Sequence, residues 1–198
     1  MKEIIKSFCL NHLKEFKIEI QDLSDDMINM YVEKETGNYK LLANIVTLEK
    51  MNFHETDIKC LLFHEKGHYE LKHLEVKNNF WINLFLSVLL IFIFFMLLVL
   101  NIFTNINYLL ILSPLSLAFY LGYDNLQYLK RMRESEIEAD GYACTYCNKD
   151  DFISMLEKME IFYSGYQNKK NNKLLYLLET HPSTEKRIKS VLNYSSIY

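Results

Sequence analysis

The chain has 198 residues, a formal net charge of −3 and 50% hydrophobic residues, enough for one modest domain. Acidic and basic residues are interspersed, and no basic stripe with interleaved aromatic residues is present, so nucleic-acid binding is not expected. The apolar residues are unevenly distributed, because residues 78–123 contain no Asp, Glu, Lys, Arg or His. This distribution indicates a membrane-associated chain with charged parts on both sides of an apolar segment.

Residues 1–50 predict a short amphipathic helix followed by strands. Phe16–Ile20 alternates between polar and apolar residues, and Ile28–Val32 and Leu41–Leu48 do so less strictly. Gly37 and Asn38 separate the last two segments and are typical of a hairpin turn. We therefore expect a small sheet beside the helix that follows.

That helix contains His64-Glu65-Lys66-Gly67-His68, the H-E-x-x-H pattern. Residues four apart share one face of a helix, so His64 and His68 can bind a single metal ion. Glu65 lies one step around the helix, where a general base for metal-activated water belongs. The pattern also arises by chance, and His73 does not have the spacing of a metzincin third ligand. We expect His73 to be solvated or to contact a ligand rather than the metal.

A substrate-binding strand is a further expectation for this kind of site. Zinc proteases commonly hold the substrate as an added strand at the edge of a sheet. Leu41–Leu48 is the candidate edge strand, and an ordinary core strand is the alternative.

Phe80–Leu100 predicts a membrane span. It is uncharged and rich in Leu, Ile, Phe and Val, and as a helix it would rise about 31 Å, close to the roughly 30 Å hydrocarbon core. Tyr108–Tyr123 is apolar again and contains Pro114. We interpret it as the return helix of a hairpin, kinked at the proline, with a buried helix as the alternative.

Basic residues flank this hairpin on both sides, and its connecting loop has none. They are Lys66, Lys72, Lys77, Lys130, Arg131 and Arg133. The positive-inside rule then predicts a multi-pass protein of the cell membrane, with two spans and with both termini and the active site in the cytoplasm.

Two acidic pairs follow the hairpin at helical spacing. Glu134/Glu138 and Glu136/Asp140 lie on different faces of the expected helix. Like charges at this spacing repel, so a pair that faces a cation would be stabilised. Spacing alone does not decide which pair that is.

Three motifs together resemble a known family. They are H-E-x-G-H-x-x-L-x-H at 64–73, R-x-x-E-x-x-A-D at 133–140 and H-P-x-x-x-x-R-I at 181–188. In this order they resemble the membrane zinc endopeptidases typified by HtpX and the CAAX prenyl protease, over about residues 56–195.

The resemblance implies a role for each matching residue. It implies zinc ligands at His64, His68 and Glu136, one ion per chain, and a carboxylate at Asp140 that orients a ligand histidine. The same resemblance implies that His181 and Arg187 lie near the substrate carbonyl and its developing oxyanion, beside the base Glu65.

The expected fold is mainly α with a small N-terminal β-sheet, a zincin-type metalloprotease core interrupted by a transmembrane helical hairpin. Residues 1–77 would form the N-terminal catalytic half, 78–125 the hairpin and 126–198 the C-terminal catalytic half with the third zinc ligand.

The expected function is that of an integral membrane zinc metalloendopeptidase acting in membrane protein quality control or peptide processing. Its partners would be a protein or peptide substrate and the lipid bilayer, with a homo-oligomer or a membrane protein as partners that the sequence leaves open. One alternative is a zinc peptidase that cleaves repressors, and another is a non-catalytic, membrane-anchored zinc or adaptor protein.

Overall fold

The structure, a computed structural model, describes residues 1–14, 16–21, 30–35, 38–75, 79–101, 108–166 and 181–194. Its elements are α1 (Lys2–His12), β1 (Phe16–Gln21), β2 (Met30–Glu35), β3 (Asn38–Asn44), α2 (Ile45–Lys50), α3 (Glu55–Glu70), η1 (His73–Glu75), α4 (Phe80–Asn101), α5 (Tyr108–Ala143), α6 (Lys149–Tyr166) and α8 (Thr184–Asn193). The chain divides into two compact units, the first comprising Met1–Val76 and Arg133–Tyr198 and the second Lys77–Met132.

The N-terminal sheet has the strand order β1-β3-β2. β1 runs parallel to β3, and β2 runs antiparallel to it with Val32 opposite Leu41. The predicted hairpin agrees with the antiparallel register, in which Glu35 pairs with Asn38, while Gly37 lies outside the described residues. β3 is the central strand, so the candidate assignment of Leu41–Leu48 as an edge strand is wrong, and the alternative of an ordinary core strand agrees with the sheet. In the described sheet, β1 and β2 are the two edge strands.

The predicted strand Leu41–Leu48 is also too long. β3 ends at Asn44, and α2 begins at Ile45. The backbone N–H of Thr47 donates to Oδ1 of Asn44 at 3.4 Å, which is the bond that an N-cap residue makes to start a helix. The run of apolar residues continues through this cap, so hydrophobicity alone does not show where the strand ends.

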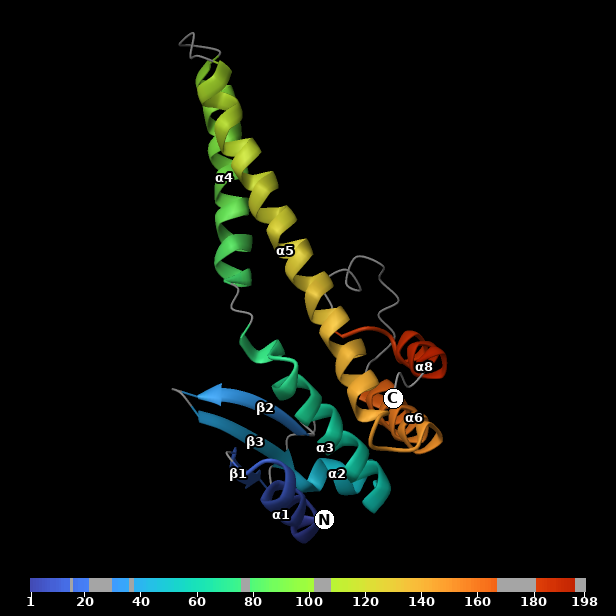
Figure 1. Ribbon diagram of the computed structural model, residues 1–198. Coiled ribbons are helices and arrows are strands. Elements are labelled where there is room, and N and C mark those ends of the chain that lie inside the picture. The colour runs from blue at the N-terminus through green and yellow to red at the C-terminus, as the bar shows by residue number, and fades with distance from the viewer. Residues whose placement is uncertain are drawn as a thin grey trace. The chain divides into compact units, whose positions relative to one another are not determined.

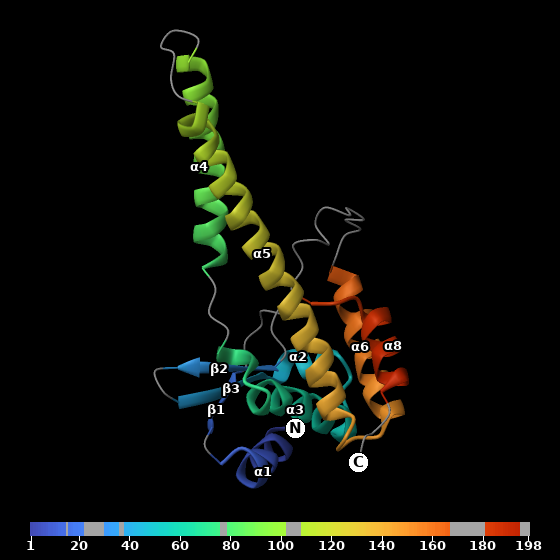
Figure 2. The same ribbon diagram turned by 45° about the horizontal axis from the view of Figure 1, so that its top comes forward.

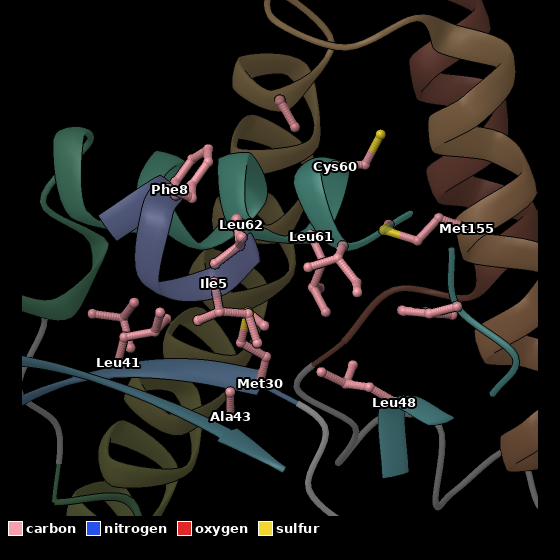
Figure 3. Packing of buried hydrophobic residues seen from close by; sticks show 14 of the residues in the cluster. Ile5, Phe8, Met30, Leu41, Ala43, Leu48, Cys60, Leu61, Leu62 and Met155 are labelled. Atoms are coloured by element: carbon pink, nitrogen blue, oxygen red, sulfur yellow. The ribbon is translucent and has the colours of Figure 1, made fainter. Parts of the chain in front are cut away.

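One hydrophobic core holds the first unit together. Ile5 of α1, Leu41 of β3 and Leu62 of α3 are fully buried in this cluster (Figure 3). α3 contacts α1, β2 and α6, and it is therefore anchored on several sides within its unit (Figure 1). Further members of the core are Leu48, Ile58, Phe152, Met155, Leu156 and Val191.

In the second unit, α4 and the first part of α5 pair antiparallel. Nδ2 of Asn83 donates to Oδ2 of Asp124 at 3.2 Å, and Nδ2 of Asn125 donates to the Phe80 carbonyl at 3.3 Å. Later residues of α4 thus pair with earlier residues of α5, and both views show these segments side by side (Figures 1 and 2). α5 continues through Pro114 and past Met132, where the second unit ends.

Among the described helices, α4 alone is long and apolar enough to cross a membrane by length and composition. Only 6% of its most apolar window is buried, so residues such as Trp81 and Phe85 are exposed rather than covered by the chain. The apolar part of α5, Tyr108–Tyr123, is shorter than the roughly 20 residues that a span needs. The structure therefore contains one candidate span and does not establish the second.

Candidate metal centre

α3 supplies the H-E-x-x-H residues, and the buried apolar face of this helix determines the direction in which their side chains point. Ile58, Leu61 and Leu62 are buried in the core, which fixes the rotation of the helix about its axis. At its start, the backbone N–H of His54 donates to Oδ2 of Asp57 at 2.7 Å. Asp57 therefore caps the start of the helix from its first turn, by accepting from the backbone of the N-cap residue His54.

Three side chains converge on one point. The Nε2 atoms of His64 and His68 are 3.2 Å apart, and Oε1 of Glu136 is 3.4 Å from Nε2 of His68. Oε2 of Glu136 is 3.6 Å from Nε2 of His64. Ligand atoms held about 2.0–2.1 Å from a tetrahedral zinc ion lie about 3.3–3.4 Å from one another, so these distances and this donor set fit zinc.

Gly67 allows the two helices of this site to approach closely. A Cβ at this position would lie 3.1 Å from Cα of Ala139 and 3.1 Å from Cβ of Tyr142, both on α5. His64 and His68 lie on α3 and Glu136 lies on α5, so the missing side chain sets the distance between the two sources of ligands. A glycine that weakens the helix by up to about 1 kcal/mol thus has a packing reason.

Glu65 lies beside the three convergent groups and is buried. Its Oε2 accepts a hydrogen bond from the backbone N–H of Val32 at 3.0 Å, so the edge strand β2 anchors this carboxylate. Burial raises the pKa of Glu65, although the neighbouring histidines and the Val32 N–H act in the opposite direction. A raised pKa makes this carboxylate a better proton acceptor, as a general base requires.

Asp140 lies directly behind His64. Its Oδ1 is 2.9 Å from Nδ1 of His64, within ion-pair distance. Arg187 donates to both oxygens of Asp140, from Nε at 2.8 Å and from Nη2 at 2.6 Å. Burial acts to raise the pKa of Asp140, and Arg187 outweighs it and lowers the pKa, so this carboxylate stays charged.

His181 and Arg187 border the metal-binding group on the α8 side. Nε2 of His181 is 3.6 Å from Oε1 of Glu136, and Nη1 of Arg187 is 3.9 Å from Oε2 of the same residue. The side chain of His181 is 67% exposed, whereas Arg187 is buried. The structure thus brings together the residues to which the resemblance gives a role, namely His64, Glu65, His68, Glu136, Asp140, His181 and Arg187.

His73 makes two contacts at the site, and of these only the one to Glu138 had no signal in the sequence. Nδ1 of His73 is 3.1 Å from Nδ1 of His68, and Nε2 of His73 is 2.9 Å from Oε2 of Glu138. The expectation that His73 contacts a ligand rather than the metal agrees with this geometry. Of the two acidic pairs, Glu136/Asp140 faces the metal-binding group, and Glu138 points to His73 instead.

The comparisons with known proteins agree with this geometry. The model of peptidase family M48 matches residues 1–195. The crystal structure of S. mikatae Ste24p is similar with a TM-score of 0.60 and 19% identity, over 96% of this chain and 48% of that chain. The chain thus spans about half the length of this solved relative, and at this identity the likeness extends to the fold alone. No curated protein matches the chain.

Proposed function

We propose, because the chain belongs to peptidase family M48, that it is an integral membrane zinc endopeptidase that hydrolyses peptide bonds at a cytoplasmic site. The observation that carries the proposal is the complete His64, His68 and Glu136 triad with Glu65 beside it. Family membership also makes the repressor-cleaving alternative the weaker one.

The residues of the site divide the reaction among them. Zinc, held by His64, His68 and Glu136, would supply Lewis acidity that lowers the pKa of water and polarises the scissile carbonyl. Glu65 takes the proton from the attacking water on its carboxylate and passes it to the leaving amine. The bond from Val32 holds this carboxylate in place during both transfers.

His181 and Arg187 support the reaction in different ways. The exposed imidazole of His181 is the group that can donate to the developing oxyanion, and one such donor typically contributes about 3–4 kcal/mol. Arg187 is buried with two of its donors on Asp140. We therefore assign Arg187 mainly to holding Asp140 and, through Asp140, His64. The positive charge of Arg187 also lies near Glu136.

The substrate would add as a strand to the edge of β2. The N–H of Val32 points away from β3 and reaches Glu65, so this edge of the strand faces the catalytic base. A peptide paired with β2 would have its backbone beside Glu65, and pairing through main-chain atoms suits substrates of varied sequence. Unfolded segments of membrane proteins and short peptides have this extended backbone, which supports a role in membrane protein quality control or peptide processing.

We assign two spans, α4 and the apolar start of α5, to the membrane. The antiparallel hydrogen bonds between them and the exposed apolar surface of α4 support this assignment. Basic residues before and after the hairpin support cytoplasmic termini. The membrane-bound protein is expected to resist alkaline extraction. Its release as a soluble protein would contradict integration into the membrane.

The decisive test is zinc content and proteolysis in detergent-purified protein. Wild type should bind close to one zinc per chain and cleave an unfolded protein substrate. Glu136→Ala should lose the metal, whereas Glu134→Ala, on another face of the same helix, should keep it. Glu65→Gln should retain zinc and lose proteolysis. A Glu65→Gln variant that cleaves as well as wild type would refute the mechanism.

A further inference from the structure

A chain of hydrogen-bonding groups leads away from the metal-binding group on the side of His68. It runs from Nδ1 of His68 to Nδ1 of His73 over 3.1 Å, and from Nε2 of His73 to Oε2 of Glu138 over 2.9 Å. The side chain of His73 is 11% exposed, so its ring is enclosed between these two partners. The contacts join η1 to α5 within the first unit.

The backbone after α3 is built to return His73 to this place. The N–H of Leu71 donates to the carbonyl of Gly67, and the N–H of Lys72 donates to that of Tyr69, both at 3.0 Å. Lys72 then has a φ of 58°, in the left-handed region that non-glycine residues rarely adopt. This turn ends the helix just before η1, which begins at His73, so the ring contact depends on a conformation with an energetic cost.

Metal binding would fix which group donates and which accepts in each of these hydrogen bonds. With Nε2 of His68 on zinc, the proton of the neutral ring is on Nδ1, and this N–H must donate. Nδ1 of His73 must then accept, which leaves the His73 proton on Nε2, facing Glu138. A carboxylate can only accept, so each group has the role that its neighbour requires.

The two histidine ligands are thus supported differently. Asp140 approaches Nδ1 of His64 directly and is itself held by Arg187. His68 has a second histidine between its ring and the carboxylate. Such partners of ligating histidines fix the tautomer and the ring orientation, and their loss typically weakens metal binding by about 10- to 100-fold.

We propose that His73 and Glu138 are positioning residues of the metal centre, which hold His68 in the tautomer and orientation that zinc requires. The inference rests on the proposed zinc site and adds the support of its second histidine ligand. It assigns no direct contact between these two residues and the substrate or the metal.

Zinc affinity, measured by competition with a chelator on the full-length protein in detergent, tests the proposal. His73→Leu should weaken zinc binding about 10- to 100-fold. His73→Gln should restore part of this loss, because its amide can both accept and donate. Glu138→Gln should weaken binding about tenfold, at the low end of the same range. Glu138 is exposed, so this variant is expected to fold.

Glu134→Gln is the matched control, one helical turn before Glu138 and likewise exposed. Melting temperatures of the metal-free proteins show whether a variant acts on folding instead. If Glu138→Gln binds zinc like Glu134→Gln, or His73→Gln binds no better than His73→Leu, the proposal is refuted. A wild type without zinc would refute the proposed function itself, so the two failures are distinguishable.

Discussion

Arg187 holds both carboxylate oxygens of Asp140, at 2.8 and 2.6 Å, and both side chains are buried. Asp140 in turn lies 2.9 Å from the ring of His64. The arginine of the C-terminal motif is therefore connected to a zinc ligand through one carboxylate. This geometry makes the pair a structural support of the site as well as part of its electrostatics.

Removing the arginine should destabilise the first unit. Arg187→Met leaves Asp140 as a buried charge without its main partner, and breaking a buried pair in this way costs about 3–5 kcal/mol. Chemical denaturation monitored by circular dichroism measures the change in the free energy of unfolding. Lys189→Met, an exposed position on the same helix, should change it by less than about 0.5 kcal/mol. Equal stability of the two variants would contradict the role of the pair.

Adding one methyl group at Gly67 should separate the helices that carry the ligands. The new Cβ of Gly67→Ala would lie 3.1 Å from the Ala139 backbone, which cannot move aside cheaply. Overpacking costs about 1–3 kcal/mol, which outweighs the gain of up to about 1 kcal/mol in helix propensity. We expect lower stability and weaker zinc binding, measured by denaturation and chelator competition.

Gly122→Ala is the matched control for this substitution. No atom lies within 4 Å of a Cβ at Gly122, which is also helical. Its propensity gain should therefore leave the protein equally or more stable, with zinc affinity unchanged. If Gly67→Ala behaves in the same way, the close approach of α3 and α5 does not set the ligand distances.

As the pH is lowered, zinc affinity should begin to fall at a higher pH than it would with a histidine of ordinary pKa. Burial lowers the pKa of His68, but its hydrogen bond to Glu136 and the nearby carboxylates outweigh burial and raise it above 6.5 in the metal-free site. Zinc takes the neutral ring, so protons compete as the pH falls through this raised pKa. In chelator competition at several pH values, the pH at which affinity has fallen to half of its plateau should lie above 6.5, and half-loss at or below pH 6.5 would contradict the raised pKa.

The turn at Lys72 should tolerate glycine better than lysine. Lys72 has a φ of 58° and is exposed, so Lys72→Gly relieves backbone strain and should stabilise the protein by up to about 1 kcal/mol. Asn52 has a similar φ of 55°, but asparagine adopts this region more readily, so Asn52→Gly should gain less. Thermal unfolding compares the two, and destabilisation by Lys72→Gly would contradict the assignment.

Much of the metal centre was predictable, because the spacing of residues on one helix defines which of them share a face. This applies to His64 and His68, and the motif resemblance extended it to Glu136. The apolar composition of residues 80–100 likewise predicted α4. These features depend on local geometry or on composition, which the sequence states directly.

The rest depends on contacts between distant segments. β3 lies between β1 and β2 although it follows both in the chain, so strand order did not reveal the edge strand. Glu138 is exposed and 65 positions from His73, and nothing in its local pattern distinguishes it from Glu134. The partner of Arg187 was equally hidden, because its donors could have served the substrate instead of Asp140.

The order of the segments has a consequence for the timing of activity. The whole second unit lies between His68 and Glu136 along the chain. Pairing of Asn125 with Phe80 shortens the effective loop to about a third, which lowers the entropic cost of closing it by about 1 kcal/mol. A nascent chain in which Glu136 has not yet been synthesised lacks the third ligand. After synthesis, the site assembles more readily once the hairpin has formed. Under the proposed function, proteolytic activity would thereby depend on the formation of the helical pair.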